Sequence, residues 1–274
     1  MRTHSIVVSV VVLACLTAVA AHAQRPGPEG FIREGVPRMP NPPGPAPTRD
    51  LSGVWVGPQN NEPDPVPPMT PAGEALFTLQ KPYGTASRNE DLGASNDPFI
   101  TCDPLGFPRN LLAHAVSSRG RMIFGSAPDR MLIAYEQQRV WREIWMDGRA
   151  LPAAVDVRGA PDSRYYGYSV GHWEGDNTLV IDTTGVDERP WLDEVGRPRS
   201  SSARIQERYT RLDQYNLQLA VRVDDPKFYA RPWTWMRANF YWVMGQEFEE
   251  TFCIPSEGIE YRDSLARPSG IEIP

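Results

Sequence analysis

The chain has 274 residues, with 28 Lys and Arg against 34 Asp and Glu, and its formal net charge is −6. An acidic surface repels phosphate groups, so we expect neither nucleic acid nor an anionic membrane among its partners.

The first 23 residues have the three parts of a secretory signal. Arg2 supplies the positive end, an apolar run follows from Ile6 to Leu16, and Ala21-His22-Ala23 forms a cleavage site. The apolar run is shorter than the roughly 20 residues that cross a bilayer, so we expect no membrane span. A lipid attachment at Cys15 is the alternative, but the apolar stretch continues past it and favours cleavage after Ala23. We therefore predict a periplasmic or secreted protein.

Cleavage after Ala23 leaves two cysteines, Cys102 and Cys253, and two histidines, His114 and His172. An even pair of cysteines in an oxidising compartment predicts a disulfide, and two buried free thiols are the alternative. No spacing of these residues is typical of a metal site, and no phosphate-binding or dinucleotide-binding motif is present. We expect no metal and no cofactor.

Residues 24–49 are rich in proline and poor in apolar side chains, which predicts a disordered leader. We expect a single domain over residues 50–262, followed by a tail over residues 263–274. One helix is predicted from Pro71 to Leu79, because Thr70 can cap it and proline suits its first turn.

Apart from that helix, apolar residues alternate with polar ones between turn residues, which is typical of strands. The pattern predicts an all-β antiparallel meander, which forms a closed barrel of about 8–10 strands or, alternatively, a two-sheet sandwich. The predicted strands are Asp50–Trp55, Leu111–Ser117, Arg121–Gly125, Met131–Tyr135, Val140–Met146, Tyr166–Trp173, Thr178–Thr184, Ala203–Leu212, Leu217–Val223, Trp233–Val243 and Glu247–Cys253.

Two predicted strands mix aromatic and charged residues on one face. If these faces line the barrel, they form an aromatic pocket with one carboxylate and one guanidinium, suited to a flat acidic ligand. If they face solvent, they are amphipathic surface with an ion pair. Alternation groups Trp141, Glu143 and Trp145 on the first strand, and Trp233, Trp235, Arg237, Asn239 and Tyr241 on the second.

A second candidate cluster lies on a predicted hairpin. Alternation places Tyr166, Tyr168 and His172 on one face, with Asp182 on the partner strand, where it could orient the imidazole. Such a group could move a proton without a metal, and the alternative is a structural histidine. On the next strand Glu207 and Arg208 point to opposite faces, so one of the two charges is expected to point inward. A buried carboxylate there is either paired or a candidate base.

The motifs of the chain resemble those of a large family of secreted bacterial proteins, most of them uncharacterised. Where this family usually has histidine, the chain has Leu151, Arg199 and Arg204, so roles that depend on those imidazoles do not carry over. The resemblance rests on Asp50-Leu51-Ser52-Gly53-Val54-Trp55, Asn96-Asp97-Pro98, Cys102-Asp103-Pro104-Leu105-Gly106-Phe107-Pro108-Arg109, Trp141 to Arg149, Gly167 to Asp176, Glu207-Arg208 and Asp224-Asp225-Pro226.

The Gly53-Val54-Trp55 motif on the first strand, followed by a meander, is also similar to lipocalin-type barrels. That likeness implies a barrel interior used either by carriers of apolar ligands or by cofactor-free enzymes such as phenolic acid decarboxylases.

Our leading hypothesis is a cofactor-free lyase or isomerase for a small aromatic or terpenoid molecule. In it Arg237 holds the acidic group of the ligand, while Glu143, His172 or Glu207 moves the proton. The alternatives are a carrier of small apolar molecules that does no chemistry, and a structural protein of the cell envelope.

Overall fold

The computed structural model describes residues 43–82, 95–115, 121–245, 247, 252–261 and 263–264, which belong to one compact unit within residues 39–274. The predicted signal peptide with Cys15, the leader as far as residue 42 and the tail from residue 265 lie outside the described residues. Among the described residues, no helix has the length and apolar character needed to span a bilayer.

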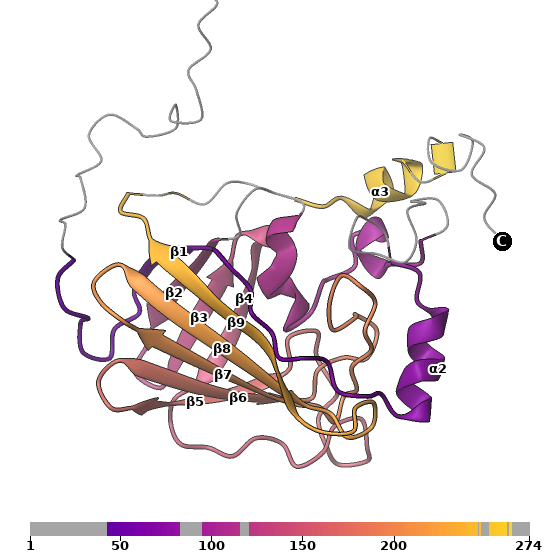
Figure 1. The fold of residues 1–274 in the computed structure, drawn as a ribbon, viewed down its shortest axis with the longest axis horizontal. Coiled ribbons are helices and arrows are strands. Elements are labelled where there is room, and N and C mark those ends of the chain that lie inside the picture. Colours follow the sequence, from indigo (N-terminus) through magenta and orange to yellow (C-terminus); the bar gives the residue numbers. More distant parts are fainter. Residues whose placement is uncertain are drawn as a thin grey trace, which may run out of the picture. The chain divides into compact units, whose positions relative to one another are not determined.

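Nine strands follow one another around a closed barrel, and β1 lies beside β9 (Figure 1). The closing pair is antiparallel and sets Trp55 opposite Trp242. The predicted all-β closed barrel is thereby confirmed, and the two-sheet sandwich is excluded. The strands are β1 (Gly53–Val56), β2 (Arg121–Ser126), β3 (Arg130–Tyr135), β4 (Val140–Trp145), β5 (Tyr168–Glu174), β6 (Thr178–Thr184), β7 (Arg204–Arg211), β8 (Asn216–Asp224) and β9 (Trp233–Trp242).

One pair of neighbouring strands is parallel, so the barrel is mixed and not a pure antiparallel meander. In β4 and β5, Ile144 lies opposite Ser169 and Trp145 opposite Val170. A parallel pair needs a connection that returns the chain to the end where the first strand began. Residues 146–167 supply this connection.

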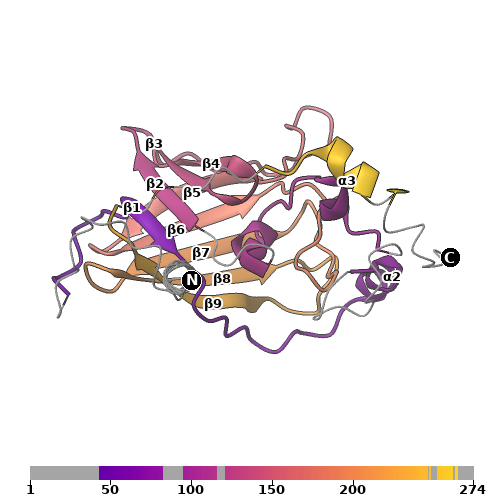
Figure 2. The ribbon, with the colours of Figure 1, turned by 90° about the horizontal axis from the view of Figure 1, so that it is seen from above.

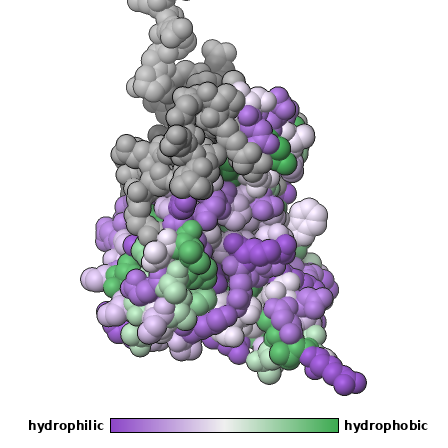
Figure 3. Space-filling model, turned by 90° about the vertical axis from the view of Figure 1, so that its right-hand side faces the viewer, coloured by the Kyte–Doolittle hydropathy of each residue, from purple (hydrophilic) through white to green (hydrophobic). Residues whose placement is uncertain are grey.

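The core of the protein fills the barrel. Figure 2 shows the strands of the barrel after a 90° turn from the view of Figure 1. On β8, Leu217, Leu219, Val221 and Val223 are all fully buried, in agreement with the alternation of apolar and polar residues in the predicted strand. Burial of each such side chain contributes about 1.5–3 kcal/mol. On the face seen in Figure 3, hydrophobic residues form separate patches among hydrophilic ones.

Helix α2 (Pro71–Leu79) has the predicted bounds, and the Gly73 amide donates to the Thr70 hydroxyl at 3.1 Å. A Cβ atom at Gly73 would lie 2.5 Å from the carbonyl oxygen of Phe228, so the helix packs closely there. The described residues also form the 3-10 helices η2 (Pro98–Thr101), η3 (Arg109–Ala115) and η4 (Gln137–Arg139), and the short helix α3 (Pro255–Tyr261).

The predictions of strands at Leu111–Ser117 and Glu247–Cys253 are wrong. The apolar residues Leu111 and Leu112 belong to η3, since a short apolar run suits a buried helical turn as well as a strand. Glu247 and residues 252–253 lie in no strand, while residues 248–251 lie outside the described residues. The strands from Arg121 to Val243 are all present.

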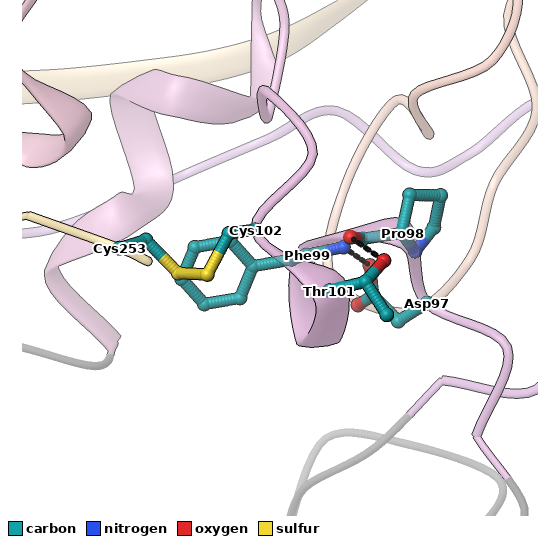
Figure 4. The surroundings of a disulfide bond; sticks show 6 residues. All are labelled: Asp97, Pro98, Phe99, Thr101, Cys102 and Cys253. Atoms are coloured by element: carbon teal, nitrogen blue, oxygen red, sulfur yellow. Dashed lines mark hydrogen bonds between the residues drawn. A yellow bond between two sulfur atoms is a disulfide. The ribbon is translucent and has the colours of Figure 1, made fainter. Parts of the chain in front are cut away.

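The sulfur atoms of Cys102 and Cys253 lie 1.99 Å apart, so the predicted disulfide pairing is confirmed (Figure 4). Cys102 ends η2 in a left-handed conformation, with φ of 62°. Cys253 precedes α3, a helix with no buried residue among those described. The disulfide therefore ties the segment after the barrel to η2, and not to a final strand as expected.

Part of the predicted disordered leader is attached to the barrel turns. Gly44 accepts a hydrogen bond from the Gln214 amide at 2.9 Å, and the Arg49 side chain donates to the Gly175 carbonyl at 3.2 Å. The β5–β6 and β7–β8 turns thus offer backbone partners to residues 43–49. The ordered region begins before residue 50.

Candidate functional site

The barrel interior holds a buried ion pair between Arg142 on β4 and Glu207 on β7. The two guanidinium nitrogens Nη1 and Nη2 lie 3.0 and 2.8 Å from the two carboxylate oxygens, and both residues are at most 2% exposed. Burial opposes the charge on Arg142, but the adjacent Glu207 carboxylate outweighs it and raises the pKa of the guanidinium. The Arg142 guanidinium therefore stays charged at any physiological pH.

Hydroxyl groups and one aromatic ring complete this cluster. The phenol of Tyr209 donates to Glu207 at 2.7 Å, and the ring of Phe107 lies with its centroid 3.7 Å from the guanidinium carbon of Arg142. Further hydrogen bonds from Arg142 reach Tyr135, Ser169 and Thr183. The inward position and pairing of Glu207 agree with the prediction from the sequence, but both of its carboxylate oxygens accept hydrogen bonds. It lacks the free oxygen that a general base needs.

The predicted pocket face of β4 points away from the barrel interior. Trp141 is 70% exposed, Glu143 pairs with Arg130 across the outer surface, and Trp145 lies between two arginine side chains there. Alternation correctly grouped the three residues, but the opposite face of β4 carries the inward Arg142 and Ile144. The prediction that Trp141, Glu143 and Trp145 line an interior pocket is therefore wrong.

The predicted face of β9 is divided between the two sides of the barrel wall. Trp233 and Trp235 are buried, whereas Arg237 and Asn239 are exposed and Tyr241 is half-buried. Arg237 lies 3.6 Å from the Asp64 carboxylate and donates to a backbone carbonyl, so it is part of the outer surface.

A β-bulge in β9 explains this division. Val221 on β8 pairs with Met236 and the next residue, Arg222, pairs with Thr234, so Trp235 is an extra residue in β9. An extra residue shifts the alternation by one position. Trp233 faces inward before the bulge, and Arg237 faces outward after it. The prediction of a shared face is wrong for this reason.

The predicted His172 and Asp182 couple is also absent. His172 is in register with Val180, is exposed, and has its Nε2 3.7 Å from Glu174. Asp182 is in register with Val170 and accepts a hydrogen bond from Gln206 at 2.9 Å. Glu174 is therefore the neighbour of His172, and Gln206 is the neighbour of Asp182.

Tyr166 and Tyr168 do not share a face. Tyr166 is mostly buried, and this burial raises the pKa of its phenol, whereas the Tyr168 hydroxyl donates to the Asp162 carbonyl near the surface. Gly167 between them has φ of 68°, a conformation outside the strand region, so alternation does not extend back across it. β5 begins only at Tyr168.

A pocket of about 450 Å³ lies on the outer wall of the barrel, over β5 to β8. Its floor is one row of outward side chains in direct register, from Val170 through Asp182 and Gln206 to Arg222. Further lining comes from Leu151 in the β4–β5 connection, from Thr183 and Ile205, and from the register partners Arg204 and Asp224.

Two guanidinium groups at this pocket are available to a ligand. Arg204 and Arg222 are exposed, and within the described part of the chain neither guanidinium group forms an ion pair or a hydrogen bond. Asp182 is the one predicted catalytic residue that lines the pocket. In the sequence, Arg204 and Leu151 stand out only as departures from the pattern of the family that the chain resembles, and no motif distinguishes Arg222.

The described residues contain no group of three or more His, Cys, Asp or Glu side chains that could hold a metal ion. The chain matches no protein-family model and no curated protein sequence.

Proposed function

We propose that this protein binds a small molecule that carries both an acidic group and an apolar body, in the pocket over β5 to β8. The observation that carries the proposal is the pair of arginines, Arg204 and Arg222, at the edge of a pocket of about 450 Å³. That volume lies within the range of small-molecule sites, which is roughly 300–1,000 Å³.

The lining supports a ligand of mixed character. Leu151 and Val170 offer apolar contact, while Arg204 and Arg222 favour a carboxylate or phenolate, for which arginine provides a planar fork of donors. Asp182, held by Gln206, accepts a hydrogen bond from a hydroxyl group. A hydroxylated aromatic acid combines all three features.

The test uses 4-hydroxybenzoate as the probe and isothermal titration calorimetry as the measurement. We expect a dissociation constant of about 0.1–1 mM, since few atoms contribute to binding of so small a ligand. Changing Arg204 and Arg222 together to glutamine is expected to weaken binding at least about tenfold, through lost charge-assisted hydrogen bonds. Binding is also expected to weaken as salt is added, because both arginines are exposed.

Two controls accompany this measurement. 4-Hydroxybenzyl alcohol has the same ring without the carboxylate and is expected to bind much more weakly. Arg237→Gln removes an exposed arginine on the outer face of β9 and is expected to leave binding unchanged. Equal affinity for 4-hydroxybenzoate and 4-hydroxybenzyl alcohol contradicts the proposal. So does a loss of binding in Arg237→Gln when the double variant of Arg204 and Arg222 still binds.

Asp182 supports a second candidate, a cofactor-free lyase or isomerase that acts in the same pocket. Gln206 holds Oδ1 of Asp182, and Oδ2 accepts no hydrogen bond from the described residues, as a general base requires. Incubation with aromatic and terpenoid acids, followed by mass spectrometry, is expected to show a changed product. Asp182→Asn is expected to slow its formation by about 100-fold or more. A carrier instead returns every ligand unaltered.

We also propose that the protein is exported, as the N-terminal residues predict. The disulfide supports this proposal, because such bonds persist in oxidising compartments. The N-terminal residue of the protein recovered from the producing cells tests the proposed cleavage after Ala23.

A further inference from the structure

The guanidinium group of Arg199 is buried without a contacting partner. Arg199 lies in the connection between β6 and β7 and is 1% exposed. Its three nitrogens, Nε, Nη1 and Nη2, have no hydrogen-bond partner in the described part of the chain. A buried charge without a partner is costly, so such a group needs a physical explanation.

The carboxylates that act on Arg199 from a distance are engaged elsewhere. Asp187 accepts two hydrogen bonds from the side chain of Arg189, at 2.9 and 2.6 Å. Asp225 accepts from the amide and the hydroxyl of Ser200, both at 2.7 Å. Burial lowers the pKa of Arg199 to about 10, which leaves the group charged at neutral pH.

Arg199, Tyr166 and Asn110 each lie against the backbone of Gly106. A Cβ atom at Gly106 would overlap Nη2 of Arg199, so the backbone there packs directly against the guanidinium. The hydroxyl of Tyr166 interacts with the Gly106 backbone and electrostatically with Arg199, and it donates no hydrogen bond to a described residue. The buried side chain of Asn110, whose backbone amide donates to the Gly106 carbonyl, is likewise without partners.

We propose that Arg199 and Tyr166 form a buried binding site for a small carboxylate of about the size of formate or acetate. A planar carboxylate can accept two parallel hydrogen bonds from the guanidinium fork and a further one from a phenol. The bound carboxylate also places a negative charge in contact with the Arg199 guanidinium, which the surrounding protein carboxylates do not. The site shares no residue with the outer pocket and does not depend on the function proposed above.

The test compares thermal unfolding of the mature protein in sodium formate and in sodium gluconate at equal ionic strength. Gluconate is a carboxylate too large for an enclosed site and serves as the reference anion. We expect formate to raise the melting temperature in a saturable manner, by about 5–10 °C at a hundredfold excess over its dissociation constant. Chloride at the same concentration is expected to raise it less, because it cannot accept two parallel hydrogen bonds.

Three variants assign the effect to this site. Arg199→Gln is expected to abolish the difference between formate and gluconate. Tyr166→Phe is expected to weaken the apparent formate affinity about tenfold, through the loss of one hydrogen bond to a charged group. Arg208→Gln, which removes an exposed arginine on β7, is expected to retain the full response.

Several outcomes overturn the proposal: equal melting temperatures in formate and gluconate, an equal rise in chloride, or a formate response that survives in Arg199→Gln. If Arg199→Gln does not fold, an unchanged formate affinity in Tyr166→Phe also overturns it. A variant with both Arg204 and Arg222 changed to glutamine separates the two sites, since it is expected to lose the outer pocket and keep the formate response.

Discussion

Changing Glu207 to glutamine is expected to lower the free energy of unfolding by about 3–5 kcal/mol. The variant leaves the Arg142 guanidinium buried without its counter-charge, and removal of one partner of a buried pair has a cost of this size. For a domain of 150–250 residues, the melting temperature then falls by roughly 6–20 °C. Urea unfolding followed by circular dichroism measures the change.

The exposed pair between Arg208 and Glu174 provides the matched control. Its side chains are 42% and 46% exposed, so Glu174→Gln is expected to leave the free energy of unfolding nearly unchanged. Replacing both buried charges, with Arg142→Met and Glu207→Leu, is expected to recover part of the loss, because no charge is left unpaired. Equal costs for Glu207→Gln and Glu174→Gln would contradict the structural role of the buried pair.

Removing the disulfide with Cys102→Ser and Cys253→Ser is expected to release the segment around α3 while the barrel stays folded. The bond closes a loop with a sequence separation of 151 residues, for which loop-closure entropy alone amounts to about 5 kcal/mol. No residue of α3 is buried among those described, so the segment gains freedom once the bond is absent. The measured loss in global stability is therefore expected to be smaller than the entropic figure.

Limited proteolysis tests this expectation. In the double serine variant, cleavage is expected within residues 252–264, at a rate well above that of the oxidised protein, and the barrel fragment is expected to persist. Treatment of the original protein with a reductant is expected to give the same fragment. A variant that loses the barrel and the α3 segment together would show that the disulfide supports the whole fold.

Strand alternation predicted which residues share a face but not which face lies inside. On β4 the sequence places aromatic side chains on one face and Arg142 with Ile144 on the other, and hydrophobicity favours the aromatic face as the core. The structure places Arg142 inside because Glu207, far along the chain, faces it across the barrel. Glu207 supplies the counter-charge that lets Arg142 lie in the core.

Two local departures from alternation were also invisible in the sequence. The bulge at Trp235 depends on the register between β8 and β9, and register is a property of two strands together. The positive φ of Gly167 ends the alternation before β5, although glycine also occurs inside strands, as Gly171 does. Both departures moved predicted binding residues to different sides of the barrel wall.

The sequence by itself determined the all-β class, helix α2, the strands from Arg121 to Val243 and the pairing of Cys102 with Cys253. These features follow from local periodicity, from helix capping and from the count of cysteines. Only the tertiary structure decided the parallel β4–β5 pair, the buried ion pair and the outer pocket. The pocket floor joins Val170, Asp182, Gln206 and Arg222 from four strands, and hydrogen bonding between those strands alone brings the four together.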